Sequence, residues 1–313
     1  MRKVIDDPRL MVRVCDLYYN QGISQQQIAK DLNLSRPTVS RVLALAKEQG
    51  IVKISITNAV EHWELERRLE KEFGLREVII VGENSSEDGM KESLGEAAAR
   101  YLEYTIKDGN IVGVSMGSTL FEVVSHVVHP AAQKVTFVPL VGGVGRVRME
   151  LHANSLAESL SRIYDGKFVP LHAPARVSSR NIRDELLKED SLLPAIYLTQ
   201  KLDIAVVGIG YPNEKSAIMA TGYFKENEIE SLIDRKVAGE LCMQFYDIYG
   251  DTAPYKDDNN VIGMDISMLR SVPRSIGIAG GVEKLRAVRG AINGHYINTL
   301  ITDIECAEAL ISE

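Results

Sequence analysis

The chain has 313 residues, of which 45% are hydrophobic and 25% are charged, and these values are typical of globular proteins. The length is sufficient for one large core and a small second domain. The net charge of −7 argues against a protein that coats nucleic acid over its whole surface, but the charge is uneven: residues 1–60 carry +4 and the remainder carries −11. A basic head on an acidic body is expected when the head contacts phosphates and the body has another task.

The cysteines and the N-terminus give no sign of export, metal binding or membrane insertion. Cys15, Cys242 and Cys306 are odd in number and far apart, and no C-x-x-C occurs. This pattern predicts reduced packing cysteines, with neither a zinc site nor disulfides. The N-terminus lacks an apolar signal-peptide core, and no apolar run approaches the roughly 18 residues of a membrane span. We therefore expect a cytoplasmic protein without metal or cofactor.

The first sixty residues have the pattern of a helix-turn-helix. Residues 8–20 form an apolar helical stripe, and a second helix is expected from Ser24 to about Asp31 because Ser24 and Gln27 have the S-x-x-Q form of a capping box. Ser35 is a good N-cap for a third helix that ends near Gly50, and proline is tolerated in its first turn.

The third helix has one apolar face and one short, basic face. Its apolar stripe, expected to be buried, consists of Val39, Val42, Leu43 and Ala46. The other face offers small side chains for close approach to a major groove, with hydroxyl and guanidinium groups for base edges and phosphates. The predicted DNA-binding residues are Ser35, Arg36, Pro37, Thr38, Ser40 and Arg41. Two ordinary packed helices are the alternative interpretation, but the charge of this segment favours DNA.

Two further elements are predicted between the head and the body. Residues 51–57 alternate apolar and polar side chains, which predicts a strand and hence a winged variant. Lys53 on this strand is a candidate phosphate contact or simply an exposed side chain. Residues 58–74 form a highly charged helix with Trp63, which we interpret as a linker and a place to dimerise. The predicted domains are therefore 1–57, a linker helix 58–74, and a body 75–313.

Strands and helices alternate through the body. Short apolar, β-branched runs occur at residues 76–82, 111–115, 134–140, 202–210, 274–281 and 298–303. This alternation predicts an α/β domain with a mostly parallel sheet that is covered on both faces. Ligands of such sheets bind beyond the carboxyl ends of the strands. The loops that follow the strands are therefore the candidate site.

A glycine- and hydroxyl-rich loop follows the second strand. It reads Gly113-Val-Ser115-Met-Gly117-Ser118-Thr119 and then opens a helix, which suits a phosphate. The same G-x-S-x-G spacing matches the nucleophile elbow of serine hydrolases, with Asp203 or Asp247 and His295 as the available partners. A strand-to-helix turn without a ligand is the third interpretation.

Other glycine loops follow later strands. One contains Gly142 and Gly143, another Gly208 and Gly210, and a third leads through Gly280 and Gly281 to Lys284. A lysine in the first turn of a helix is unfavourable unless an anion binds there, although a solvated surface lysine is the simpler interpretation. Together these loops predict a site for a polar, anionic small molecule.

Several of these segments jointly resemble a known family. They are LYYNQGISQQQIAKDLNLSRPTVSRVLALAKEQGIV, GVSMGST, PLVGG, DIAVVGIG, AGELCMQFYDIYG and IAGGVEKLRAVRGAINGHYINTLITD. The chain resembles the SorC-type sugar-binding transcriptional regulators over essentially its whole length. The resemblance implies a helix-turn-helix joined to a Rossmann-like domain similar to sugar-phosphate isomerases but without their activity. It also implies operator DNA and a phosphorylated sugar as partners, and a homo-oligomer that is usually a tetramer.

The resemblance also implies the effector contacts. It places the phosphate at Gly117, Ser118, Thr119 and Lys284, and the rest of the sugar at Gly142, Gly143, Asn154 and Asp247. Asn154 lies where the match is looser. The 140–148 loop contains no lysine, so we expect non-covalent binding rather than an imine with an aldehyde sugar.

An enzyme fused to a DNA-binding head is the alternative class. A sugar-phosphate isomerase needs a general base over the C2 proton with a second acid or base beside it. Glu240 and Asp247 lie seven residues apart on one expected strand and so point to opposite faces. No paired carboxylates are therefore predicted, which favours a regulator with no catalytic residues.

Overall fold

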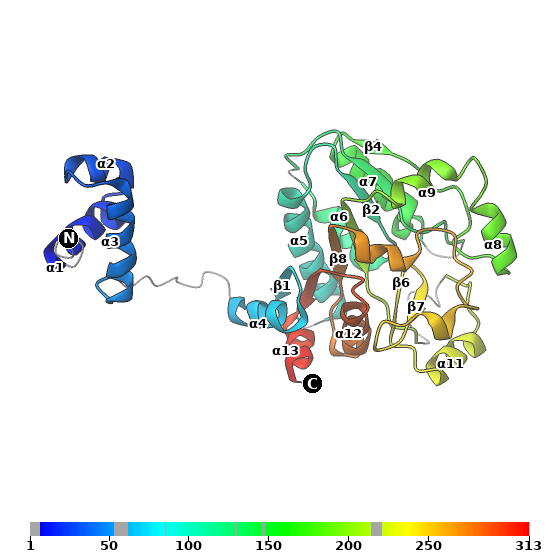
Figure 1. Cartoon of the computed structure of the whole chain (residues 1–313). Helices are drawn as coiled ribbons and strands as arrows, with labels where there is room; N and C mark the ends of the chain where they lie inside the picture. Colours follow the sequence, from blue (N-terminus) through cyan, green and yellow to red (C-terminus); the bar gives the residue numbers. More distant parts are fainter. Residues whose placement is uncertain are drawn as a thin grey trace. The chain divides into compact units, whose positions relative to one another are not determined.

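The structure is a computed structural model that describes residues 7–52, 62–84, 86–128, 130–145, 148–213 and 221–312. The chain divides into two compact units, Met1–Glu61 and His62–Glu313 (Figure 1). Each unit has its own core.

The first unit is a small helical domain. Its elements are α1 (Pro8–Cys15), a π-helical turn (Asp16–Asn20), α2 (Gln25–Asp31) and α3 (Arg36–Glu48). The three α-helices enclose one apolar cluster to which each contributes, for example Met11, Ile28 and Val42, all fully buried. The stripe predicted on α3 is buried as expected. The sequence pattern therefore predicted the helices and the inward face of α3.

Local capping explains where these helices begin. The Oγ atoms of Ser24 and Ser35 accept the N–H groups of Gln27 and Thr38, each at 3.2 Å. Only half of the expected capping box forms, because the Gln27 amide donates instead to Asp31 at 2.7 Å. The turn between α2 and α3 places Asn33 at φ 57°, a left-handed conformation that asparagine tolerates.

The expected strand at 51–57, with Lys53, lies mostly outside the described residues. Helix α4 (Trp63–Phe73) forms within the region expected to be a linker. Its Leu69 is fully buried in the core of the second unit, and α4 contacts β1 and α13. The described part of this helix therefore belongs to the second unit.

The second unit is built on a seven-stranded sheet in the order β1-β9-β8-β5-β2-β3-β4 (Figure 1). Its strands are β1 (Glu77–Val81), β2 (Ile111–Val114), β3 (Thr136–Pro139), β4 (Lys167–Phe168), β5 (Ile204–Gly208), β8 (Arg274–Ile278) and β9 (Thr299–Asp303). Every pairing is parallel, which confirms the predicted α/β class. Only β4 was not predicted, because two residues are too short to produce an apolar run.

Helices cover both faces of the sheet. One face is covered by α5 (Glu87–Thr105), α6 (Ser118–His126) and α7 (Ala153–Ile163), and the other by α9 (Leu193–Thr199), α12 (Leu285–Asn293) and α13 (Ile304–Ser312). Along β5, Ile204 and Val206 are buried under α5, α6 and α7, whereas Ala205 and Val207 are buried on the opposite face of the sheet. A strand buried on both faces has no polar alternation, so it appears in the sequence as a continuous apolar run.

The remaining elements lie outside the sheet. They are α8 (Arg180–Leu186), α11 (Glu226–Asp234), the antiparallel pair β6 (Gly239–Leu241) and β7 (Gln244–Tyr246), and 3-10 turns at Met149–Leu151, Ala253–Tyr255, Ile266–Ser271 and Val282–Lys284. The prediction that Glu240 and Asp247 lie on a single strand was wrong. The chain reverses at Cys242 and Met243, which adopt φ 51° and 62° and form a tight hairpin turn.

Candidate DNA-binding helix and effector pocket

The exposed face of α3 presents the polar groups predicted to contact DNA. Arg36, Pro37, Ser40 and Arg41 are exposed, and Thr38 is half-buried. The hydroxyls of Ser35 and Thr38 lie 2.7 Å apart, and Ser35 also caps the helix. The side chains left to project from this face are therefore mainly Ser40 and the two arginines. Their role as DNA contacts stays a prediction.

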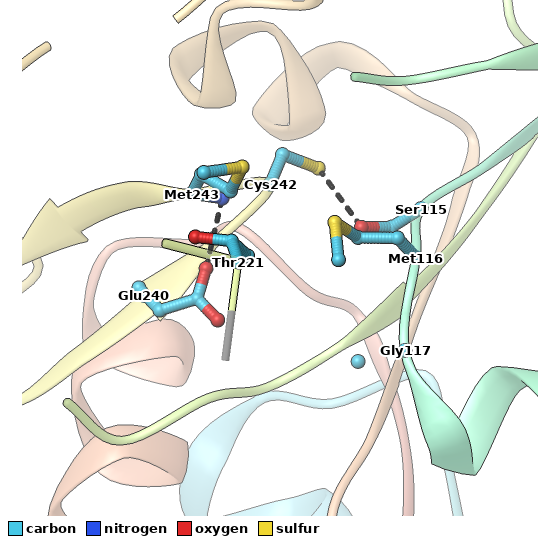
Figure 2. A pocket seen from close by; sticks show the side chains of 8 residues that line it. Ser115, Met116, Gly117, Thr221, Glu240, Cys242 and Met243 are labelled. Carbon is cyan, nitrogen blue, oxygen red and sulfur yellow. Dashed lines mark hydrogen bonds between the residues drawn. The ribbon is translucent and has the colours of Figure 1, made fainter. Parts of the chain in front are cut away.

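The topology of the second unit creates a crevice between β2 and β5. From β2 the chain continues to β3 and β4 on one side, whereas β5, β8 and β9 follow on the other. Such a switch in strand order leaves an opening beyond the carboxyl ends of the two strands, where ligands of parallel sheets bind. The structure has a cavity at this place. It is lined by Ser115, Met116, Gly117, Gly208, Thr221, Glu240, Cys242 and Met243 (Figure 2).

The β2 side of the cavity ends in a helix N-terminus. Gly117 has φ 128°, a conformation that L side chains rarely adopt, and it directly precedes α6. Ser118 and Thr119 form the first turn of α6, where backbone N–H groups have no partner within the helix. These amides and hydroxyls, with the positive end of the helix dipole, suit an anion.

Lys284 lies across β5 from this turn. It ends the 3-10 turn after β8, and β8 and β2 are both neighbours of β5, which places these two strands about 10 Å apart. Lys284 is half-buried, and among the described residues its ammonium group has no hydrogen bond and no ion pair within 4.0 Å, whereas its backbone N–H donates to Gly281 O at 3.0 Å. Burial lowers its pKa, which the charges of Glu283, Glu87 and Glu240 partly oppose. A buried cation of this kind favours an anionic partner.

Glu240 is the acidic side chain of the cavity lining. Its Oε2 accepts the Met243 N–H at 2.8 Å, which holds the carboxylate at the hairpin turn (Figure 2). Burial raises the pKa of Glu240 to about 7, and the hydrogen bond and the charge of Lys284 act in the opposite direction. The cavity lining therefore includes Gly117, which precedes a helix N-terminus, and a carboxyl group with a pKa of about 7 on which the charge of Lys284 acts.

Comparisons with known proteins agree with this architecture. A sugar-binding domain family matches residues 57–312, and a winged helix-turn-helix DNA-binding family matches residues 17–53. The chain belongs to the SorC family of sugar-binding transcriptional regulators. It is 31% identical to the deoxyribonucleoside regulator of Bacillus subtilis, covering 97% of this chain and 98% of that protein. It is 32% identical to the sorbitol operon regulator of Klebsiella pneumoniae, covering 98% of both.

A solved structure supports the same conclusion. Full-length SorC from Klebsiella pneumoniae superposes with a TM-score of 0.75 at 32% identity, covering 98% of this chain and 99% of that one. The predicted family and fold are therefore confirmed. These relatives are named transcriptional regulators, so the chain is a DNA-binding regulator rather than an isomerase.

The other effector contacts implied by the resemblance are engaged within the regulator itself. The Gly142 and Gly143 N–H groups donate to Ile262 O and Ala173 O at 2.9 and 2.8 Å. These amides are therefore not free donors for a sugar.

The side chains of Asn154 and Asp247 also form hydrogen bonds within the protein, in both cases to the backbone of loops. The Asn154 amide bonds both to the N–H and to the O of Leu171, at 3.0 and 3.1 Å. Asp247 Oδ1 accepts the N–H groups of Tyr249 and Asp251, both at 2.9 Å, at the base of the hairpin whose tip lines the cavity. Of the predicted effector contacts, Gly117 lines the cavity, Ser118 and Thr119 follow it in α6, and Lys284 acts through its charge on the lining residue Glu240.

The positions of the candidate residues in the sheet exclude the serine-hydrolase interpretation. Ser115 follows β2 at the carboxyl edge of the sheet, whereas Asp203 precedes β5 and His295 precedes β9 at the amino edge. A four-residue strand separates the two edges by about 13 Å. Ser115 is buried, and its Oγ accepts a hydrogen bond from the Cys242 thiol, whose Sγ lies 3.6 Å away. His295, the base that either acid would have to act through, is therefore too far from Ser115 to activate it as a nucleophile.

Of the residues that line the cavity, Gly117 was predicted as an effector contact, and Met116 and Gly208 lie in glycine loops that were predicted to form the site. Thr221, Cys242 and Met243 were not singled out. Their side chains carry little chemical signal, and it is the fold that brings them together. Within the described residues, no cluster of His, Cys, Asp and Glu has the composition of a metal site. None of the described helices has the length and apolar character needed to cross a membrane.

Proposed function

We propose that this regulator controls a carbohydrate-catabolic operon and that a phosphorylated sugar bound in the second unit controls its affinity for operator DNA. Two observations carry the proposal: the α6 N-terminus directly follows the cavity residue Gly117, and the charge of the half-buried Lys284 acts on Glu240 in the cavity lining. Backbone N–H groups and a lysine favour a dianion over a neutral sugar. We place the phosphate at Gly117, Ser118, Thr119 and Lys284.

The proposal extends to assembly and location. A single helix-turn-helix contacts too little DNA for tight recognition, so we propose a homo-oligomer, a dimer of dimers, that binds two half-sites. Operator binding requires access to the chromosome, and we propose a cytoplasmic location. The six residues of the α3 face, Ser35 to Arg41 without Val39, are the proposed DNA contacts.

Calorimetry on the Lys284→Ala variant tests the effector site. A thermal-shift screen of sugars and sugar phosphates first identifies a ligand, since a ligand at a hundred times its Kd stabilises by about 2.7 kcal/mol. We expect the wild type to bind the phosphorylated form of that sugar much more tightly than the sugar itself. Lys284→Ala should lose most of this preference, whereas the exposed Lys188→Ala should retain it. Equal affinity of the wild type for both forms would contradict the proposal.

A further inference from the structure

Helix α4 lies along the free edge of the sheet. Strand β1 is the last strand in the sheet order and pairs only with β9 among the named strands. An edge strand leaves a row of backbone N–H groups without sheet partners, and native proteins usually cover or blunt such an edge. Here α4 contacts β1 directly, and α13 contacts α4 (Figure 1).

Two carboxylates of α4 take the place of a neighbouring strand. Glu66 Oε1 accepts the Ile80 N–H at 3.0 Å, and Glu70 Oε1 accepts the Val78 N–H at 3.1 Å. The spacing matches, because four residues of an α-helix rise about 6 Å and two residues of a strand span about 6.6 Å. We call this pair of hydrogen bonds, Glu66–Ile80 and Glu70–Val78, the edge clamp.

The Glu66–Ile80 bond of the edge clamp is buried, and the Glu70–Val78 bond is partly buried. Glu66 is only 6% exposed, and Leu69 between the two glutamates is fully buried in the core. Burial raises the pKa of Glu66, and the neighbouring Glu70 carboxylate adds to this rise, while the hydrogen bond from Ile80 opposes it. A carboxylate in such a position is costly for a helix that merely connects two domains. The cost indicates that the position of α4 matters.

The clamp also sets the direction of α4. Since Glu66 pairs with Ile80 and Glu70 pairs with Val78, the helix runs antiparallel to β1 and begins at the carboxyl edge of the sheet. His62, the first residue of the second unit, lies beside Gly82 just after β1. The chain therefore enters the second unit at the same edge of the sheet as the effector cavity.

We propose that the edge clamp couples the two units by fixing α4, and hence the point and direction at which the chain enters the effector unit from the DNA-binding unit. This inference rests on the proposed function, because fixed entry points restrict where the helix-turn-helix units of an oligomer can lie. Restricting them raises the effective concentration of one unit at the second half-site once the other is bound. Releasing α4 therefore weakens operator binding without any change in the α3 surface.

The test compares two double variants of the full chain. Glu66→Ala with Glu70→Ala removes both acceptors, whereas Glu66→Gln with Glu70→Gln keeps an acceptor oxygen at each position and removes the charge. Hydrogen exchange in peptides that cover β1 and α4 should be about tenfold faster in the alanine variant than in the glutamine variant. Exchange in β5, at the centre of the sheet, should be the same in both.

Operator affinity provides the functional measurement. A DNA fragment selected from random sequence by the wild type should bind the alanine variant about fivefold or more weakly than the glutamine variant. Unchanged exchange in β1 and α4 would overturn the clamp itself. Faster exchange with equal operator affinity of the two variants would overturn its coupling role. Failure of the wild type to select any DNA would instead overturn the proposed function. The hydrogen-exchange rates of β1 and α4 would still show whether the edge clamp stabilises these elements.

Discussion

The residue whose protonation matters most in the cavity is Glu240. Its pKa of about 7 lies above the usual glutamate value because the carboxyl group is buried. A group with a raised folded-state pKa contributes stability that is present below its unfolded pKa, about 4.3, and is lost as pH rises through the folded value. Ionised Glu240 therefore opposes folding above neutrality, and it also opposes a nearby phosphate.

We expect the Glu240→Gln variant to gain stability relative to the wild type as pH rises from 5 to 8. Glutamine keeps an oxygen that can accept the Met243 N–H and has no charge to bury. Denaturant unfolding of both proteins at several pH values measures this difference. The affinity for a phosphorylated ligand should change in the same direction, with the wild type losing affinity relative to Glu240→Gln above pH 7. A pH-independent difference between the two proteins would contradict this role.

Arg36 and Arg41 carry the prediction for DNA recognition at the residue scale. Both are exposed at the beginning and middle of α3, and neither has an ion pair among the described residues. Replacing Arg41 by alanine should weaken specific binding by about 1–3 kcal/mol if it contacts a base edge. If Arg36 contacts phosphate, Arg36→Ala should weaken binding to all sequences equally and reduce the salt dependence. Affinities on operator and unrelated DNA, across salt concentrations, separate the two roles.

At the scale of elements, the recognition helix depends on its first turn. Ser35 Oγ accepts the Thr38 N–H and also contacts the Thr38 hydroxyl. Ser35→Ala should therefore cost about 0.5–2 kcal/mol of stability in the first unit, whereas Ser35→Asp should retain the cap. Thermal unfolding monitored by helical circular dichroism measures this effect. Equal midpoints for the serine and alanine proteins would show that the cap contributes little.

The elements that the sequence predicted share a strong local signal. Strands such as β2 and β5 are continuous apolar runs because both sheet faces are buried, and α2 and α3 begin at serine caps. The β6–β7 hairpin was missed for the opposite reason. Its turn uses Cys242 and Met243 at positive φ, where glycine or asparagine is usual, so no turn signal exists in the sequence.

The candidate site was predictable only where the backbone itself forms it. Gly117 and the start of α6 are evident from a glycine followed by hydroxyl residues at a strand end. Side chains such as Asn154 and Asp247 are ambiguous, because the groups that would hold a sugar hold loops equally well. Glu240 reaches the cavity through a hairpin whose existence the sequence did not reveal. Tertiary structure therefore decides which polar residues are available to a ligand.

At the scale of the whole molecule, control requires a ligand that prefers one arrangement of the regulator. Binding alone shifts no equilibrium unless the ligand has different affinities for two states. A phosphate held between the α6 N-terminus and Lys284 would gain its full contacts only when the segments after β2 and β8 are close. The approach of these two segments would take place at the carboxyl edge of the sheet, which is also the edge where α4 begins. A ligand of this kind would therefore act at the end of the sheet from which the chain leads to the DNA-binding unit.

Assembly into an oligomer is the last property that we propose for this regulator. One helix-turn-helix contacts a single half-site, and two-fold symmetry of the protein is normally matched by two-fold symmetry of the operator. On α4, Trp63 remains 42% exposed although Leu69 on the same helix is fully buried, so Trp63 is available to a second copy. We expect light scattering to show an oligomer at micromolar concentration. Trp63→Ala should shift the population toward smaller species and weaken operator binding, whereas the exposed Tyr249→Ala, on a loop of the second unit, should do neither. A wild-type monomer with full operator affinity would show that recognition does not require assembly.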